Sequence, residues 1–290
     1  MRVKMKLLFQ EDMDELIRKG KFTEERKEKY MKWVVNAERA RKIGSLDETL
    51  NQYDKAEEVL TWCTFAPLLR MNAEQRIVTI NEFLNPRLSL DVVVSNPCLN
   101  FEKMLLPSES YYDKMTTDHP VKYIRETIES HRKKGILLEK HTHIDLLIET
   151  DELIIPIEAK FTSDIDYQRT YSCIRNQIAR TIDVSIEAAK KARPPKKVLF
   201  LLCVPRVLYN EGRYYYYKMK DYESLENLKH DLPHQADFLD AYFNSANVFF
   251  WEDVASTVIR NAVKWNLLNT DELEALKEFY DERLIKLSLK

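Results

Sequence analysis

The segment spanning residues 143–161, HIDLLIETDELIIPIEAKF, constrains the fold of this chain most strongly. Two apolar runs, 143–149 and 153–161, flank a short polar stretch, and this pattern is typical of a β-hairpin. Both runs are almost continuously hydrophobic, as in strands that are buried on both faces. Because strand side chains alternate between two faces, one face of the first arm is predicted to carry Ile144, Leu146 and Ile148.

Three ionic side chains are embedded in this predicted hairpin. Glu158 and Lys160 are two residues apart and therefore share a face of the second arm. With a two-residue turn between the arms, Asp145 lies opposite Glu158, and a slip of one residue would still leave the two acids adjacent. The sequence therefore predicts that two carboxylates and one ammonium group converge on one patch.

This patch has a clear chemical use. Two carboxylates on neighbouring strands repel each other unless a cation lies between them. Carboxylate oxygens suit Mg²⁺ and Mn²⁺, which bind phosphate oxygens at their remaining positions. A lysine on the same strand face can orient or deprotonate an attacking water, or neutralise charge on a pentavalent phosphate. Asp145, Glu158 and Lys160 therefore indicate metal-dependent hydrolysis of phosphodiester bonds.

A purely structural role is the alternative for the same three residues. Charged residues make up 32% of the chain, so an Asp followed within about twenty residues by Glu-x-Lys arises by chance roughly once per chain. Such charges often occupy the solvated face of a strand. Here the flanking residues are apolar, and burying these charges costs several kcal/mol unless they are paired or bound to a metal. This cost favours the functional interpretation.

Asp145, followed after twelve residues by Glu158-Ala159-Lys160 on the adjacent strand, resembles the PD-(D/E)XK, or restriction-endonuclease-like, nuclease superfamily. Ile144 stands where the motif name has proline, a departure that many members share. The resemblance implies a nuclease core. In that core, Asp145, Glu158 and the Ala159 carbonyl would hold Mg²⁺ or Mn²⁺, and Lys160 would position or activate the water.

The resemblance extends over about residues 120–205 and implies a further acidic ligand on the helix before the first core strand. A helix is predicted over 119–134. Glu129 lies closer to the apolar stripe of this helix than Glu126 does, so Glu129 is the better candidate. Glu109, in the preceding loop, is a second candidate, and an ordinary surface glutamate is the alternative to both.

The helix that follows the Glu-x-Lys strand, predicted over 171–190, carries further candidates. By the resemblance, a glutamine there can reach the metal-site water or a phosphate, and Gln177 flanks the apolar stripe. Arg175 and Arg180 are candidate nucleic-acid contacts, since a guanidinium can clamp a phosphate. His143 is a candidate minor contributor to nucleic-acid binding. Ordinary surface or hydrogen-bonding roles are the alternative for each of these residues.

The order of the predicted elements indicates an α/β protein with a mixed central β-sheet flanked by helices. Residues 1–100 are expected to form a helical accessory region, and residues 101–290 the nuclease-like domain with a C-terminal helical cover. Further strands are predicted at 76–80, 88–94, 136–139, 198–204 and 247–251, with a hairpin over 208–220. Further helices are predicted at 11–18, 23–41, 47–69, 252–265 and from 270 onward, the last with Leu284 on its inner face.

Four consecutive tyrosines, residues 214–217, fall in the second arm of the hairpin predicted over 208–220. Aromatic side chains can stack on the bases of a nucleic acid. Strand-forming aromatics that cover a hydrophobic core are the alternative, and this use is the commoner one.

The composition limits the classes of partner and cofactor. The net charge is −2, so any nucleic-acid surface has to be local. The first 44 residues carry an excess of five positive charges, which forms either such a surface or a solvated helical face. The four glycines are scattered and form no phosphate-cradling loop. The four cysteines form no Cys-x-x-Cys pair and no signal peptide is evident, so a reducing, cytoplasmic location is expected.

These observations predict a metal-dependent nuclease, with DNA as the expected substrate and Mg²⁺ or Mn²⁺ as the cofactor. No apolar run approaches the length of a membrane-spanning helix, and the C-terminal helices are a candidate surface for homodimerisation. The alternative is a catalytically inactive module of the same fold that binds nucleic acid or a protein partner. A small-molecule hydrolase or transferase is disfavoured, because no convincing Ser/His or Cys/His arrangement occurs.

Overall fold

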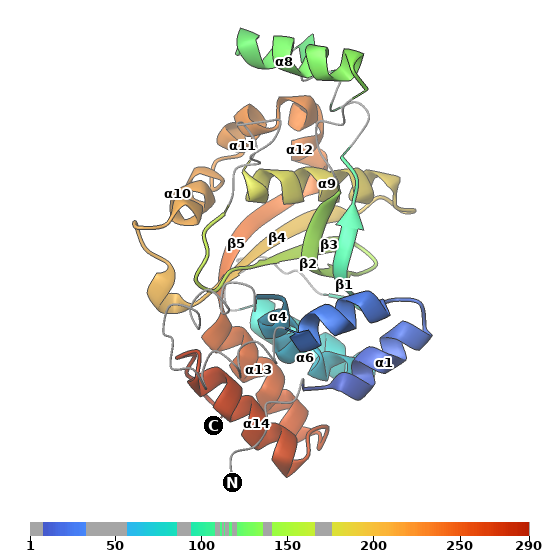
Figure 1. The fold of residues 1–290 in the computed structure, drawn as a ribbon, viewed down its shortest axis with the longest axis vertical. Helices are drawn as coiled ribbons and strands as arrows, with labels where there is room; N and C mark the ends of the chain where they lie inside the picture. The colour runs from blue at the N-terminus through green and yellow to red at the C-terminus, as the bar shows by residue number, and fades with distance from the viewer. Residues whose placement is uncertain are drawn as a thin grey trace.

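The structure, a computed structural model, is an α/β protein in which helices flank a five-stranded mixed sheet (Figure 1). It describes residues 8–32, 57–85, 94–107, 111, 113, 116–117, 121–135, 141–165 and 176–289. The predicted fold class, a mixed central sheet flanked by helices, is therefore confirmed. None of the described helices is both long and apolar enough to cross a membrane.

Five strands form the sheet, in the order in which they occur in the chain. They are β1 (Cys98–Leu105), β2 (Thr142–Glu149), β3 (Leu153–Ala159), β4 (Lys197–Val204) and β5 (Phe243–Phe250). The pairs β1–β2 and β2–β3 are antiparallel, whereas β3–β4 and β4–β5 are parallel. All residues of β3 are buried, as are all but the first of β4, which accounts for their continuously apolar sequences.

Helices cover both faces of the sheet (Figure 1). One face packs against α1 (Gln10–Arg18), α4 (Glu57–Phe65), α5 (Pro67–Arg70), α6 (Ala73–Leu84), α13 (Trp251–Lys264) and α14 (Thr270–Asp281). The other packs against α9 (Gln177–Lys191), α10 (Tyr214–Asp221), α11 (Leu225–Asp231) and α12 (Ala236–Tyr242). The helix α8 (Lys122–Lys133) lies at the end of the molecule farthest from α14 (Figure 1).

The N-terminal helices share a hydrophobic core with one face of the sheet. Trp62 of α4 is fully buried, and its ring lies 4.9 Å from that of Phe101 in β1, edge to face. The C-terminal helices join this core through Tyr280, whose hydroxyl lies 2.6 Å from Thr64 Oγ1. The region predicted as a helical accessory therefore packs directly against the strands that carry the ionic patch.

The hairpin is present with the predicted register. A bend at residues 151–152 joins β2 to β3, and Leu146 pairs with Ile157 across the two strands. Continued by one residue, this register places Asp145 opposite Glu158, as the sequence predicts.

The predicted alternation of β2 is wrong at one position. Leu146 and Ile148 face the core that contains α4, but Ile144 packs in the core on the opposite face of the sheet. The ladder between β1 and β2 is interrupted at Glu102, whose φ of 46° lies in the left-handed region. Glu102 lies opposite Asp145 in the β1–β2 register, so the sheet is irregular at the position of Asp145.

Residues 76–80, predicted as a strand, belong instead to the helix α6. The β-branched residues there favour a strand, but Asn72 and Gln75 form a capping box. The Gln75 N–H donates to the Asn72 side chain at 2.9 Å, and the Asn72 N–H donates to the Gln75 side chain at 3.1 Å. These bonds satisfy the first N–H groups of a helix and so fix its start.

The hairpin predicted over 208–220 is also wrong, because residues 214–221 form the helix α10. The carboxylate of Asp164 accepts hydrogen bonds from the backbone N–H groups of Tyr214 and Tyr215, at 2.6 and 3.0 Å. A carboxylate at this position satisfies N–H groups that have no partner within the helix. Asp164 is fifty residues away in the chain, so the local sequence gives no sign of this cap.

Other predicted elements differ in extent. The strand β5 is longer than the predicted 247–251, and α9 begins only at Gln177. Leu284, predicted to face inward, is 84% exposed because α14 ends before it, at Asp281. Parts of the predictions fall outside the described residues, namely those at 33–56, 88–93, 136–140 and 171–175.

We expect Asp164→Ala to lower the free energy of unfolding by about 1–2 kcal/mol, because the first N–H groups of α10 lose their acceptor. Asp164→Asn retains one acceptor oxygen and is expected to lose less. Urea unfolding followed by circular dichroism measures both differences. An unchanged unfolding free energy in Asp164→Ala would show that this carboxylate does not determine where α10 begins.

Candidate active site

The two acids of the hairpin are linked through the backbone between them. The Ala159 N–H donates to Asp145 Oδ2 at 2.7 Å, so the carboxylate of Asp145 reaches across to the strand that carries Glu158. Glu158 is 1% exposed and Asp145 is half-buried. Burial and the negative charge of Glu158 raise the pKa of Asp145 well above its ordinary value. In the absence of a cation, Asp145 therefore keeps its proton to a higher pH than an exposed aspartate does.

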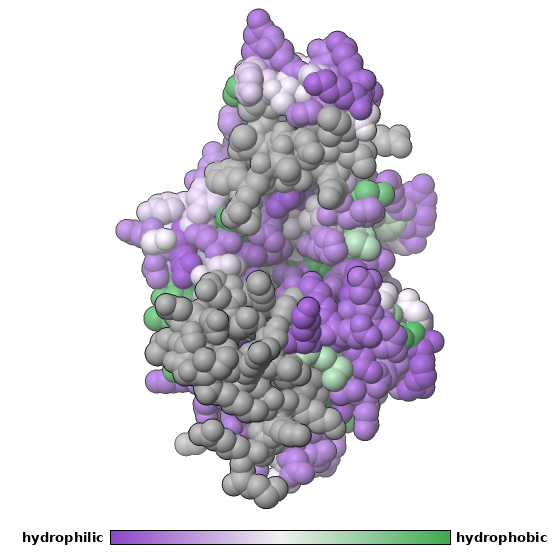
Figure 2. Space-filling view, viewed as in Figure 1, coloured by the Kyte–Doolittle hydropathy of each residue, from purple (hydrophilic) through white to green (hydrophobic). Residues whose placement is uncertain are grey.

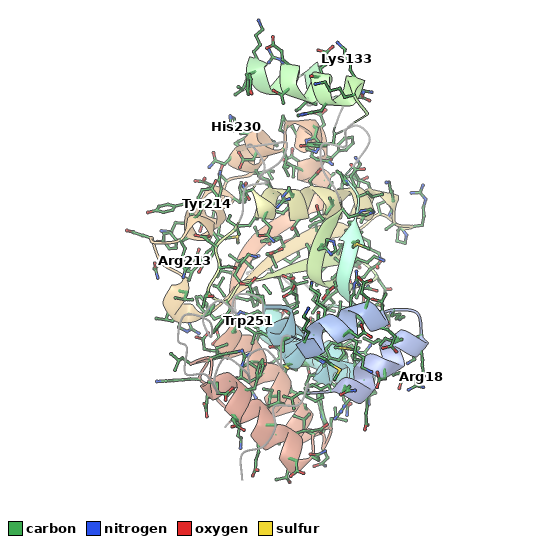
Figure 3. All side chains as sticks on the ribbon, in the orientation of Figure 1. Arg18, Lys133, Arg213, Tyr214, His230 and Trp251 are labelled. Atoms are coloured by element: carbon green, nitrogen blue, oxygen red, sulfur yellow. The ribbon has the colours of Figure 1, made fainter. Side chains whose placement is uncertain are left out.

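Lys160 is buried between two acids. Its Nζ lies 2.9 Å from Glu158 Oε1 and 3.6 Å from Glu57 Oε2. Burial lowers the pKa of a lysine, but the charges of Glu158 and Glu57 outweigh burial here, and the pKa of Lys160 is raised. The Lys160 carbonyl accepts a 2.9 Å hydrogen bond from the indole of Trp251, labelled in Figure 3. Lys160 is thus a fixed ammonium group at neutral pH, suited to neutralising charge and orienting water.

Gln177 lies at the same site. Its side-chain amide donates a hydrogen bond to Glu158 Oε1, the oxygen that also contacts Lys160. Gln177 is the first residue of α9, and the buried Asn176 caps this helix by accepting from the Ala179 N–H at 3.0 Å. The helix start therefore fixes the position from which Gln177 reaches Glu158.

Glu57 is the site residue that the sequence analysis misses. It lies at the start of α4, where its Oε1 accepts hydrogen bonds from the Phe161 N–H at 2.7 Å and from the Ser163 hydroxyl at 2.6 Å. Burial raises the pKa of Glu57, partly offset by the charge of Lys160. Its one sequence signal is an acid beside a strongly apolar helical segment, EVLTWCTF. Nothing local indicates that α4 packs against the hairpin.

A second charged group borders Asp145 on the β1 side. Glu102, beside the break in the ladder, is 6% exposed and pairs with Arg26 at 3.1 Å. His143 precedes Asp145 by two residues on β2. Partial burial and the positive charge of Arg26 lower the pKa of its imidazole. Its role in nucleic-acid binding stays a prediction.

Of the other predicted residues, Glu129 lies outside this cluster. Glu129 is an exposed residue of α8 and pairs with Lys133 at 2.8 Å, at the end of the molecule away from α4 (Figure 1). Arg180 is a partly exposed residue of α9, three positions after Gln177. Arg175 and the alternative acid Glu109 lie outside the described residues.

The donor set at the site fits a hard divalent cation. Asp145 and Glu158 supply carboxylate oxygens, and the Ala159 carbonyl is a candidate third ligand. Glu158 Oε2 is buried and has no hydrogen-bond partner among the residues that the structure describes, so this oxygen can accept a cation without breaking a hydrogen bond in the described part of the protein. No group of three or more His, Cys, Asp or Glu side chains suited to a metal occurs within the described residues. Mg²⁺ tolerates such a set, because it retains several waters and often uses only one or two carboxylates.

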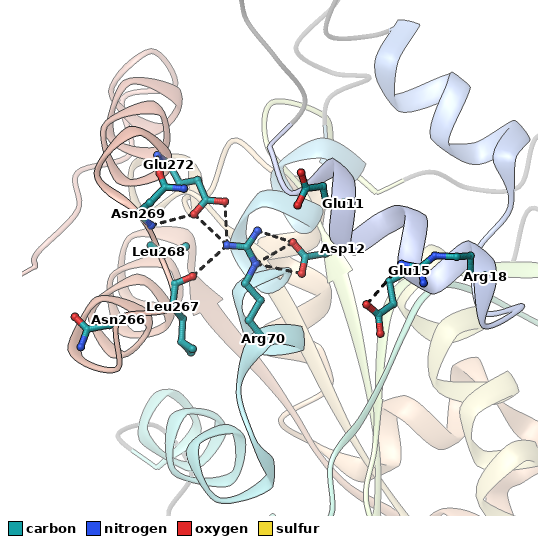
Figure 4. A pocket seen from close by; sticks show the side chains of 10 residues that line it. All are labelled: Glu11, Asp12, Glu15, Arg18, Arg70, Asn266, Leu267, Leu268, Asn269 and Glu272. Atoms are coloured by element: carbon teal, nitrogen blue, oxygen red, sulfur yellow. Dashed lines mark hydrogen bonds and ion pairs between the residues drawn. The ribbon is translucent and has the colours of Figure 1, made fainter.

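A separate pocket of about 600 Å³ lies around Arg70, between α1 and α14 (Figure 4). The Arg70 guanidinium donates to both carboxylate oxygens of Asp12 and also to Glu272 and the Leu267 carbonyl. The acids of the cluster at Asp145 do not line this pocket. Arg70 is therefore best explained as a link between the N-terminal and C-terminal helices.

Comparison of the chain with protein-family models finds no match, and neither does comparison with curated proteins or with solved structures. The function of the protein is therefore inferred from the geometry of the site.

We expect the metal-free Asp145→Asn variant to be more stable than the wild-type protein at neutral pH. The folded state raises the pKa of Asp145, so its protonated carboxyl contributes stability that is fully present below the ordinary pKa of an aspartate. This contribution is lost as the pH rises through the raised pKa of the folded protein. Asparagine keeps the acceptor for the Ala159 N–H without the charge. Each kcal/mol of repulsion removed raises the melting temperature by roughly 2–4 °C.

Calorimetry in EDTA over a pH series measures this difference, with Glu129→Gln as the control, since Glu129 is an exposed acid away from the site. If Asp145→Asn is no more stable than wild type at any pH, the two acids do not repel each other as described.

Proposed function

We propose that this protein is a metal-dependent nuclease with a restriction-endonuclease-like core, which hydrolyses phosphodiester bonds, most simply those of DNA. One observation carries the proposal. On adjacent strands, Asp145 accepts a hydrogen bond from the Ala159 N–H, next to Glu158, and Lys160 pairs with Oε1 of Glu158. The other oxygen of Glu158, Oε2, is buried and has no hydrogen-bond partner among the described residues. The sequence resemblance described above points to the same chemistry.

Asp145, Glu158 and the Ala159 carbonyl would hold the cation. When bound, Mg²⁺ or Mn²⁺ polarises the phosphoryl oxygen and lowers the pKa of a coordinated water. Asp145 has to lose its proton before it can act as a ligand, so its raised pKa makes binding of the cation stronger as pH rises.

The protein residues supply orientation and charge. Lys160 is a buried ammonium group, and it would stabilise negative charge on the phosphate and orient the attacking water. Glu57 holds Lys160 from the side of α4 and anchors the backbone at Phe161, so it acts as a positioning residue. Gln177 donates to one oxygen of Glu158, which leaves the other oxygen for the cation.

A non-catalytic module of the same fold is the second candidate. It is favoured by the fact that no group of three or more His, Cys, Asp or Glu side chains placed to hold a metal occurs among the described residues. In that case Lys160 would serve only to neutralise the buried acids, and Gln177 and the Ala159 N–H only to hydrogen-bond them. The protein would then bind nucleic acid or a protein partner without cleaving it. Homodimerisation through the C-terminal helices remains a prediction in either case.

We expect the purified protein to nick plasmid DNA with Mg²⁺ or Mn²⁺ and to lose this activity in EDTA. Asp145→Ala and Lys160→Ala should each lower the rate by at least about 100-fold, the effect typical of removing one electrostatic contact to a transition state. Glu129→Ala is the matched control and should retain wild-type activity. Agarose gel assays of nicking measure these rates.

Full activity in both site variants would rule out the assignment of Asp145 and Lys160. Binding of DNA that is insensitive to Mg²⁺, without any nicking by the wild-type protein, would instead favour the non-catalytic module.

A further inference from the structure

An aromatic surface forms where α10 meets the end of β5. We call it the tyrosine face, and it comprises Tyr209, Tyr214, Tyr216, Tyr217 and Phe250, with Arg206 and Lys220 at its edge. The Tyr209 ring lies 5.0 Å from that of Tyr216 and 6.1 Å from that of Phe250. The Tyr216 and Tyr217 rings lie 5.5 Å apart and almost perpendicular, at 88°.

The tyrosine face is open to solvent at Tyr217, whereas its other aromatic residues are half-buried against the core. Tyr217 is 49% exposed, and the neighbouring Val207 is 76% exposed. Figure 2 shows pale and green atoms among the purple ones on the flank that α10 occupies in Figure 1. Tyr217 therefore presents an accessible aromatic ring that is held in place by half-buried aromatic neighbours.

Two cations, Arg206 and Lys220, border the tyrosine face. Acids lie close to them, since Asp221 and Glu223 follow Lys220 in the chain and the Arg206 N–H donates to the Glu252 side chain. Lys220 lies 4.5 Å from the centre of the Tyr216 ring, and Arg206 lies 4.2 Å from that of Phe250. Arg206 also pairs with Asp253 at 2.6 Å, so the exposed Lys220 is the cation best placed for an added anion.

The tyrosine face is tied to the loop that follows the active-site lysine. The Arg213 guanidinium donates to the Thr162 carbonyl at 2.7 Å, and Asp164 caps α10 at Tyr214; Arg213 and Tyr214 are labelled in Figure 3. Ser163, in the same loop, donates to Glu57. One residue, Phe161, therefore separates Lys160 from a loop that contacts both Glu57 and the start of α10.

We propose that the tyrosine face binds single-stranded nucleic acid next to the cleavage site, with bases stacked on Tyr217 and its neighbours and phosphate contacted by Lys220. The proposal rests on the proposed function in that the site acts on a polynucleotide. Stacking platforms that alternate aromatic rings with cations bind single strands, because an unpaired base offers its π-face to a side chain. In a duplex the bases stack on one another, so a duplex cannot use these rings in this way.

Fluorescence anisotropy with a labelled single-stranded oligonucleotide tests the proposal. EDTA is present throughout, so that binding is measured without cleavage. Tyr217→Ala should weaken binding roughly 5- to 100-fold, the range for loss of one stacked base. Tyr217→Phe should stay close to wild type, because it keeps the ring. Lys220→Gln should weaken binding and reduce the slope of log affinity against log salt by about 0.7.

Tyr123→Ala is the matched control, because Tyr123 is 74% exposed on α8, away from the tyrosine face. This variant and wild type should bind the single strand equally. Tyr217→Ala should not change the affinity for a duplex of the same sequence. Since no divalent cation is present, these results do not depend on whether the protein cleaves DNA.

Equal single-strand affinities of wild type and Tyr217→Ala would overturn the proposal, as would a wild-type protein that does not bind the oligonucleotide. A change in oligomeric state of Tyr217→Ala on size-exclusion chromatography, with unchanged oligonucleotide affinity, would also overturn it and assign the tyrosine face to self-association.

Discussion

The repulsion between Asp145 and Glu158 is the constraint on which the rest of the site depends. Neighbouring strands place these acids side by side in an apolar sheet, and such burial is costly without compensating donors. The compensation comes from separate parts of the fold. Lys160 and the Ala159 N–H belong to the hairpin, and Gln177 reaches Glu158 from the first turn of α9. Even with these donors, one buried oxygen of Glu158 has no partner among the described residues, so the network is suited to accept a cation.

The N-terminal helices contribute to the same network of charges. The helix α4 contributes Glu57, which holds Lys160, the Phe161 backbone and Ser163 in one network. The loop after Lys160 is thereby fixed on one side by α4. Asp164, in the same loop, caps α10 on the other side. The position of the ammonium group therefore depends on packing across both faces of the sheet.

The sequence predicts the parts of the site that depend on short-range geometry. Strand alternation and turn length suffice to place Asp145 opposite Glu158, and both are readable from the hairpin itself. Gln177 follows from the helical period together with the resemblance. Glu57 could not be predicted, because its role depends on which helix packs against the hairpin. The helix α10 was missed for a similar physical reason, since its cap, Asp164, is distant in sequence. The reversal of Ile144 occurs where the neighbouring strand has the left-handed backbone of Glu102, a feature that strand alternation does not predict.

The central claim is that Asp145 and Glu158 share one divalent cation. Crystals grown with Mn²⁺ and measured at the manganese absorption edge test it directly, because anomalous scattering locates the ion independently of any activity. We predict one strong anomalous peak within about 2.0–2.3 Å of a carboxylate oxygen from each of Asp145 and Glu158, with water at the remaining positions. A crystal in which Mn²⁺ binds elsewhere, or in which Lys160 occupies the space between the two carboxylates and no peak is present, would contradict the account.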